Sequence, residues 1–307
     1  MANLIEKAKI FQQELDKQML AGATSGWMED NAGQVKYNGG SEVKIPKISM
    51  DGLGDYDREE GFAQGSVTLS FETKTLTQDR SRSFMLDSMD VNESNFIANA
   101  SKVIGEFQRT KVIPEVDAYR YSSITAQAIA KAKATGGYTA AAASILTKIQ
   151  DDINAIQDVT GEIQLMIILS GAIAGLLDSS SEIQKKLSVI DFARGELKLK
   201  VKGIDIHPII RVPSARMKSA YVFNNGKTAG QEAGGFTPAV GAKNVNWIII
   251  PRTEPIAVSK TDTLRIFDPA TNQKADAWKI DYRKYHDLWI KDNAFDAIRV
   301  NIKEALA

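Results

Sequence analysis

The stretch KIPKISMDGLGDYDREEGFAQGSVTLSF, residues 44–71, predicts two β-strands joined by a long, glycine-spaced, acidic tip. On the return strand Val67, Leu69 and Phe71 share one face, because successive side chains alternate across a strand. A strand pair of about ten residues reaches roughly 30 Å, well beyond the body from which it starts. An isolated two-stranded hairpin is at best marginally stable in water, so this apolar face requires a partner surface.

Two further elements are expected ahead of the hairpin. Apolar residues at three- and four-residue spacing predict an amphipathic helix of about four turns, which ends at the flexible stretch AGATSG. This helix fits docking either on its own domain or on a neighbouring subunit. The text GWMEDNAGQVKYNGG, residues 26–40, has no sustained period and predicts an extended arm. The apolar residues of the helix are Leu4, Ala8, Phe11, Leu15 and Met19.

Three helices are expected after the hairpin. The first follows capping side chains at residues 90–92 and continues at helical spacing to Phe107. After the text QRTK a second helix restarts with Pro114 in its first turn and stops at the TGG of residues 135–137. A third helix is expected over roughly residues 140–156.

The remaining sequence predicts an α/β middle section followed by strands. The apolar run EIQLMIILS, residues 162–170, predicts a buried strand, and short helices and alternating strands follow it. The text from Trp247 to Ile302 reads as successive strands that form a second sheet, distinct from the middle one. Between them lies a polar, glycine-rich loop, residues 224–244, which is too long for an ordinary connection and is expected to be functional or mobile.

The composition excludes several classes of protein. Lys plus Arg and Asp plus Glu both number 38, so the chain has no global positive field for nucleic acid or an anionic membrane. The absence of Cys removes disulfides, thiolate nucleophiles and Cys-ligated metals, and only two His remain. The sequence shows neither a signal-peptide core nor a run of about 18 apolar residues, so we expect a chain made and kept in a cytosol until something moves it.

Two short motifs resemble ligand-binding loops but lack required residues. NNGKT at residues 224–228 resembles the end of a phosphate-binding loop, but Tyr221 stands where the upstream glycine is needed, which favours a surface turn. DYDREEG at residues 55–61 opens like a calcium-binding EF-hand loop, but Glu60 takes the glycine position and Ser66 the position of the bidentate Glu. We interpret this tip as a solvated or partner-facing acidic segment.

Neither His predicts acid–base or metal chemistry. His286 and Asp287 are adjacent, but neighbours on a strand point to opposite faces, so the pair cannot act together. His207 precedes Pro208 within a strand and has no metal-ligand partner at a usable spacing. The sequon NES at residues 92–94 reads as the start of a helix, because nothing directs the chain to a secretory route. The sequence therefore offers no catalytic constellation.

The order of the expected elements resembles the major capsid proteins of tailed bacteriophages and prophages of Gram-positive bacteria, which have the Hong Kong 97-type fold. That order is an N-terminal arm, a long two-stranded loop, a long helix, a middle α/β section and a return to strands. The resemblance extends over about residues 1–303. Its local text is TLTQDRSRSFMLDSMDVNES, EFQRTKVIPEVDAYRYS, LMIILSGAIAGLL and DAWKIDYRKYHDLWIKDN.

The resemblance implies an α+β fold in four parts. It places the 224–244 loop near the centre of each capsomer, where its glycines would allow slightly different shapes in hexamers and pentamers. The implied parts are an N-terminal arm (1–41), an extended β-hairpin loop (42–86), a peripheral domain with a long spine helix and the C-terminal strands (87–134 and 256–307), and an axial α/β domain (135–255).

The function implied by the resemblance is structural. Copies of the chain would self-assemble as hexamers and pentamers into the icosahedral shell of a virion, in the cytoplasm of the bacterial host, and the procapsid would expand on maturation. No catalytic residue, cofactor, metal or membrane is implied, and the enclosed double-stranded DNA would be contacted weakly. A portal is a further implied partner. The chain starts almost at the arm, which implies a separate scaffold protein or scaffold-free assembly, and a decoration protein is left open.

Contacts between subunits are expected from the hairpin and from the N-terminal helix. The acidic tip would meet basic residues of a neighbour, and the apolar faces would be covered by another copy. The expected contact residues are Asp55, Asp57, Glu59 and Glu60 of the tip, Val67, Leu69 and Phe71 of the return strand, and Phe11 and Leu15 of the helix.

Two other functions fit parts of the sequence. An encapsulin-type bacterial nanocompartment would keep the fold and enclose an enzyme in place of a genome, and the neighbouring genes would distinguish the two. A monomeric or dimeric cytosolic enzyme could use the 224–244 loop as an active-site lid, although the sequence offers no nucleophile, metal cluster or cofactor loop for it.

Overall fold

The computed structural model describes most of the chain and leaves several predictions untested. The N-terminal helix with Phe11 and Leu15, and Glu60 of the tip, lie outside the described residues. So does most of the helix expected before Phe107. None of the described helices is long and apolar enough to cross a membrane. The described residues are 22–37, 40–59, 61–87, 104–180, 203–204 and 207–306.

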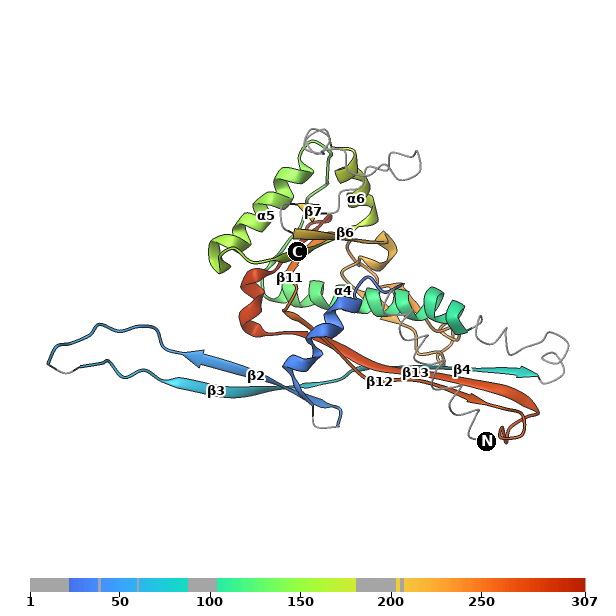
Figure 1. The fold of residues 1–307 in the computed structure, drawn as a ribbon. Coiled ribbons are helices and arrows are strands. Elements are labelled where there is room, and N and C mark those ends of the chain that lie inside the picture. The colour runs from blue at the N-terminus through green and yellow to red at the C-terminus, as the bar shows by residue number, and fades with distance from the viewer. Residues whose placement is uncertain are drawn as a thin grey trace, which may run out of the picture.

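A six-stranded sheet forms one layer of the body (Figure 1). Its central strand β6 (Leu165–Ser170) is buried along its whole length, as the apolar run predicts. Odd-numbered residues of β6 face helices α5 (Ile145–Thr160) and α6 (Gly171–Asp178), and even-numbered ones face helix α4 (Ile113–Ala130). The other strands, in the order β5-β14-β11-β6-β8-β7, are β5 (Ala134–Thr135), β14 (Arg299–Ile302), β11 (Val245–Pro251), β8 (His207–Val212) and β7 (Gly203–Ile204).

A long three-stranded antiparallel sheet lies on the other side of α4 (Figure 1). It consists of β12 (Pro255–Phe267), β13 (Ala277–Ile290) and β4 (Gln78–Asp87). The prediction of a separate second sheet is therefore right for β12 and β13 and wrong for β11 and β14. The text WIIIP is apolar on both faces, which suits β11 to the middle of the six-stranded sheet, where it pairs with β6 and β14.

The predicted hairpin is present. Strands β2 (Glu42–Met50) and β3 (Val67–Thr75) pair antiparallel, and short β1 (Lys36–Tyr37) pairs with the start of β2. The hairpin projects from the end of the long sheet (Figure 1). Strand β4 pairs along its length with β13 in the long sheet, and the expected end of the extended loop at residue 86 stays a prediction.

Residues 26–40 were expected to be extended, and this was wrong for most of them. Gly26–Gln34 form the 3-10 helix η1, which packs on β12. Met28 is fully buried, and the Asn31 side chain donates hydrogen bonds to the Arg252 and Pro255 carbonyls at 2.8 and 2.9 Å. These contacts join residues more than 200 positions apart, so they have no local signature in the sequence.

The break predicted at QRTK is also absent. Residues 104–107 are α-helical, Gln108–Val112 form the π-helical turn η2, and α4 follows without interruption. Pro114 lacks an N–H, so the regular hydrogen-bond ladder cannot pass this point, and the wider turn accommodates it. The third helix, α5, begins at Ile145 and ends at Thr160, later than expected at both ends.

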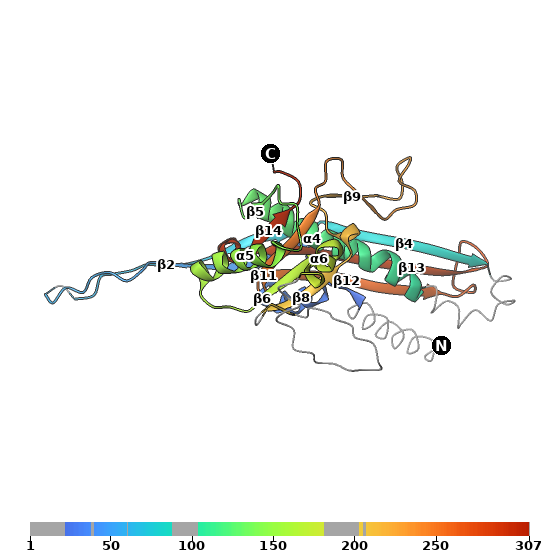
Figure 2. The same cartoon turned by 90° about the horizontal axis from the view of Figure 1, so that it is seen from above.

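The long polar loop contains a small hairpin of its own. Strands β9 (Tyr221–Phe223) and β10 (Phe236–Pro238) pair, and the connection between them lies beside β4 (Figure 2). Arg80 and Arg82 of β4 donate to the carbonyls of Gly235 and Glu232 at 3.2 and 3.1 Å. These bonds tie the loop to the three-stranded sheet, and its implied place at a capsomer centre stays a prediction. Two further 3-10 turns are η3 (Ser214–Arg216) and η4 (Asp292–Ala297).

Candidate interaction surface

The pairing of β2 with β3 places two rows of apolar side chains side by side. Met50 lies opposite Val67, Ile48 opposite Leu69, and Pro46 opposite Phe71. Directly opposed residues point to the same side of a sheet, so all of these side chains form one face. We call this the apolar hairpin face; it comprises Pro46, Ile48, Met50, Val67, Leu69 and Phe71.

The apolar hairpin face is open to solvent. Ile48 and Leu69 are each 60% exposed, Met50 69%, Val67 70% and Phe71 45%. A contiguous exposed row of large apolar side chains is unusual for a monomer and marks an interaction surface. The opposite side of the same strands is polar and carries Lys47, Ser49, Thr68 and Ser70.

The root of the hairpin is anchored in the body. Val43 and Ile45 of β2 are 0% and 2% exposed and pack with Ile256, Val258 and Trp289. Beyond Ile45 every residue of β2 except Pro46 is exposed, because the strand has left the body. The hairpin is thus anchored at its root, Lys47 adds an ion pair with Asp292 of the body at 3.6 Å, and the rest of the hairpin extends away from the body (Figure 1).

The described part of the acidic tip is a turn stabilised by its own hydrogen bonds. The Asp57 carboxylate accepts a bond from the Glu59 N–H at 2.7 Å, and the Tyr56 and Phe62 rings meet edge to face at 5.1 Å. The Asp51 carboxylate accepts bonds from Ser66, which lower the pKa of Asp51. Among the described residues, no group of three or more possible metal ligands comes together.

The predicted contact residues of the tip are at the surface. Asp55, Asp57 and Glu59 are all exposed, at the end of the hairpin that lies farthest from the body. The contact of these carboxylates with basic residues of a neighbour stays a prediction, as does a contact through Val67, Leu69 and Phe71.

The two His side chains lie in the interior. The His207 Nδ1 accepts a hydrogen bond from the Leu165 N–H at 3.1 Å, which links β8 to the start of β6. The His286 ring packs edge to face on the Tyr119 ring at 5.4 Å. The Tyr119 hydroxyl in turn donates to the Asp287 carboxylate at 2.5 Å. Tyr119 therefore contacts both members of the adjacent pair.

His286 is expected to make the folded chain sensitive to mild acid. Burial, together with the positive charges of Arg120, Lys284 and Arg80, holds the pKa of His286 well below its ordinary value of 6.5. Below that pH the unfolded chain binds a proton that the folded chain does not. The free energy of unfolding should therefore fall as the pH drops from about 6.5 to about 5, by up to about 1.4 kcal/mol per unit.

The measurement is urea unfolding of the unassembled chain across this pH range. The variant His286→Phe keeps an aromatic ring and removes the titrating group, so its free energy of unfolding should change less with pH than that of the wild type. Parallel pH profiles for the two proteins would contradict the assignment.

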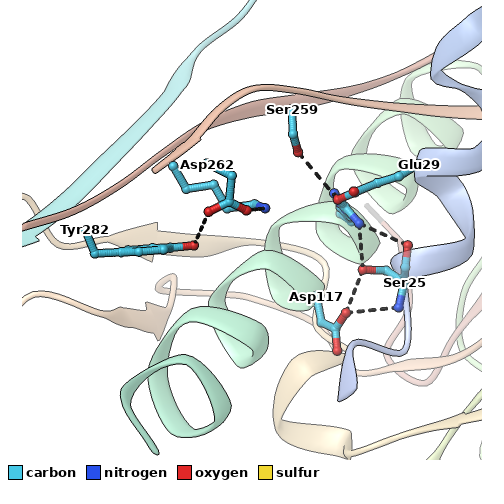
Figure 3. Close-up of polar contacts among 8 residues, drawn as sticks. Ser25, Glu29, Asp117, Ser259, Asp262 and Tyr282 are labelled. Atoms are coloured by element: carbon cyan, nitrogen blue, oxygen red, sulfur yellow. Dashed lines mark hydrogen bonds and ion pairs between the residues drawn. The ribbon is translucent and has the colours of Figure 1, made fainter. Parts of the chain in front are cut away.

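A second polar feature, unexpected from the sequence, joins η1 to α4 (Figure 3). Asp117 of α4 is fully buried, and its carboxylate accepts hydrogen bonds from the N–H and hydroxyl of Ser25 at 3.1 and 2.6 Å. It also accepts bonds from the N–H and hydroxyl of Thr24 at 3.2 and 2.8 Å. The Arg216 guanidinium donates a further hydrogen bond to the Asp117 carboxylate at 3.0 Å.

Arg120 lies one helical turn from Asp117 and is 1% exposed. Its guanidinium donates to the Ser25 carbonyl at 3.0 Å and forms an ion pair with Glu29. Burial alone would raise the pKa of Glu29, but the charges of Arg120 and Lys284 outweigh it and lower that pKa. Figure 3 shows Ser259 beside Glu29 as a further hydrogen-bond donor.

The cluster continues into the long sheet. Lys284 of β13 is 2% exposed and forms an ion pair with Asp262 of β12, which also accepts a hydrogen bond from the Tyr282 hydroxyl at 2.8 Å (Figure 3). One feature of the sequence indicates this polar cluster. Asp117 and Arg120 stand three residues apart in a helix whose buried positions are otherwise mostly apolar or small, and such a pair faces one side.

The chain is similar to known proteins in its structure and not detectably in its sequence. No protein-family model matches the chain, and no curated protein matches its sequence. The chain is similar to the mature capsid of bacteriophage PhiM1, with a TM-score of 0.56 and 13% sequence identity. The match covers 86% of this chain and 82% of that chain.

Two further solved structures are similar over most of their length. The capsid of cyanophage P-SCSP1u gives a TM-score of 0.55 at 8% identity, over 86% of this chain and 83% of that chain. Mycobacterium phage Che8 gives 0.53 at 10% identity, over 85% and 84%. The chain therefore has the mixed helix-and-strand fold of phage capsid proteins, which confirms the α+β fold class predicted from the sequence. Its division into the parts of the Hong Kong 97-type fold stays a prediction.

Proposed function

We propose that this chain, which has the fold of phage capsid proteins, is a major capsid protein whose copies form the icosahedral shell around phage double-stranded DNA. Hexamers and pentamers would be its building units. The observation that carries the proposal is the apolar hairpin face, which projects from the body and has four large side chains that are each at least 60% exposed. A second copy of the chain is the partner that a repeating shell supplies.

The size of this face indicates how assembly would proceed. Its five large side chains are 45–70% exposed. Burying the exposed area of each would stabilise a contact between subunits by about 1 kcal/mol, or about 5 kcal/mol per hairpin. Association of two proteins costs about 4–15 kcal/mol in lost freedom of movement. One hairpin contact alone would thus bind weakly, and assembly would depend on many contacts closing together in a shell.

The proposed parts follow the observed sheets. The hairpin of β2 and β3 would be the extended loop, the long sheet with α4 the peripheral domain, and the six-stranded sheet with α5 and α6 the axial domain. Equal numbers of basic and acidic residues support weak contact with DNA, because tight binding would need many phosphate contacts. Scaffold and portal proteins, and maturation by expansion, belong to the same proposal.

The direct test is to express the full chain and examine it by sedimentation and negative-stain electron microscopy. Shells or capsomers are expected. A stable monomer of 33.6 kDa at high concentration would overturn the proposal. Shells that enclose a specific enzyme in place of DNA in the native host would instead identify a nanocompartment.

Shortening the hairpin is expected to damage assembly and to spare the fold. Replacing residues 51–66 by Asn-Gly would join Met50 and Val67, which already face each other, through a two-residue turn. The root contacts of Val43 and Ile45 remain, so the melting temperature of the subunit should be close to that of the wild type. Sedimentation should show few shells. Normal shells would show that assembly does not depend on contacts made by the tip.

A further inference from the structure

The attachment of residues 24–29 to the body is mainly polar. Asp117 alone accepts four hydrogen bonds from Thr24 and Ser25, and Arg120 holds Ser25 and Glu29. The apolar part of the attachment is Met28, which is fully buried, with Trp27 packed beside it. The position of this segment thus depends largely on two charged side chains of one helix.

These charges are balanced within the cluster. Asp117, Glu29 and Asp262 face Arg120, Arg216 and Lys284, and each acid has a basic partner. Removing the segment would take Glu29 away from Arg120 and would leave Asp117 with Arg216 as its remaining described partner. A buried charge that loses its partner is strongly unfavourable, so partly detached positions are disfavoured. The geometry favours two states, attached and released.

The junction also contains a small cavity and a buried donor without a partner among the described residues. A cavity of about 10 Å³ lies between η1, α4 and β13, bordered by Glu29, Arg120 and Lys284. The Nε of Arg120 is buried and has no hydrogen-bond partner among the described residues. Both features lower the cost of opening the junction relative to the closely packed sheets.

We propose that Asp117 and Arg120 form a latch that fixes residues 24–29 on α4 and so holds the start of η1 against the body. The inference rests on the proposed function for its consequence, which is that a released segment would make the shells less uniform. Helix α4 does not need the latch in order to fold, because Tyr121, Ile124 and Ala128 anchor it in the core.

The test compares Asp117→Asn with the wild type by hydrogen–deuterium exchange. The amide has nearly the shape of the carboxylate, but its NH₂ group would face the donors of Thr24, Ser25 or Arg216. We expect exchange in residues 22–29 to rise roughly tenfold or more, with less than a twofold change in residues 122–130. Asp79→Asn is the matched control, because Asp79 pairs with Arg283 at 2.5 Å on the exposed side of the long sheet.

Two outcomes would overturn the latch. Exchange of residues 22–29 that stays at the wild-type rate would show that the polar contacts do not hold the segment. An equal rise throughout α4 and both sheets would show a general stabilising role. If Asp117→Asn does not fold, Ser25→Ala provides a milder test with the same readout, since it removes the hydroxyl that bonds Asp117 at 2.6 Å.

The exchange experiment is independent of assembly. If the wild-type chain forms no shells, the proposed function fails while the latch is still tested by local exchange. If the wild type does form shells, sedimentation of Asp117→Asn should show a broader range of particle sizes than Asp79→Asn. Equally uniform shells from both variants would contradict the proposed consequence for assembly.

Discussion

Replacing Leu69 by Asp is expected to abolish assembly and to leave the subunit folded. Leu69 lies in the middle of the apolar hairpin face, opposite Ile48, and each of these side chains is 60% exposed. In the free subunit the new carboxylate would be in water, so it should cost little. In a contact between subunits it would be buried without a partner, which costs several kcal/mol at every copy of the contact.

Sedimentation and circular dichroism would measure the two sides of this prediction. The shell fraction of Leu69→Asp should fall to near zero, and its melting temperature should stay within a few degrees of that of the wild type. Ser70→Asp is the matched control, because Ser70 is the next residue on the same strand, points to the other side and lies opposite Lys47. Equal loss of assembly in both variants would show that the apolar side is not the specific contact.

The hairpin could be predicted because its information is local. Alternation of apolar and polar residues defines a face wherever the period of two is sustained, as it is over residues 46–50 and 67–71. The strand β6 could be predicted for a similar reason, since an uninterrupted apolar run suits a strand buried on both sides. Both predictions rest on side-chain patterns that need no knowledge of distant residues.

The parts that sequence reasoning missed depend on distant partners. Thr24 and Asp117 are 93 positions apart, and β4 pairs with a strand about 200 positions away. The segment 26–34 has no period of its own, so its 3-10 form reflects contacts with β12 and α4. Propensity is a weak guide where tertiary contacts decide the conformation.

The roles of the interior polar groups also depend on distant partners and could not be predicted from local sequence. His286 and Asp287 looked like a strand pair without a joint role, and α4 brings Tyr119 against both of them. No role was predicted for Asp117 or Arg120 from the sequence. Their burial follows from the layer that η1 adds over α4, which only the folded chain reveals.

Trp247 is expected to contribute more to the stability of the subunit than any residue of the hairpin. It lies on β11, is 0% exposed, and its indole N–H donates to the Asp152 carboxylate of α5 at 2.8 Å. Trp247→Ala would leave a large cavity between the sheet and α5, a change that typically costs 3–5 kcal/mol. Burial already raises the pKa of Asp152, and loss of the Trp247 hydrogen bond, which opposes that shift, should raise the pKa further.

Urea unfolding would measure the loss in free energy of unfolding. The variant Trp247→Phe would separate the effect of the lost hydrogen bond from the effect of the cavity. The Phe variant keeps an aromatic ring against Tyr138 but removes the donor to Asp152, so it should lose about 1–3 kcal/mol, less than the Ala variant. A whole domain is stable by only about 5–15 kcal/mol, so Trp247→Ala should remove a large share of the stability of the subunit and lower its melting temperature markedly. A loss below about 1 kcal/mol in the Ala variant would mean that α5 does not depend on this contact. Leu69→Asp and Trp247→Ala could both lower the yield of shells, and only Trp247→Ala should lower the melting temperature of the subunit by much, so the melting temperature separates failed assembly from weakened folding.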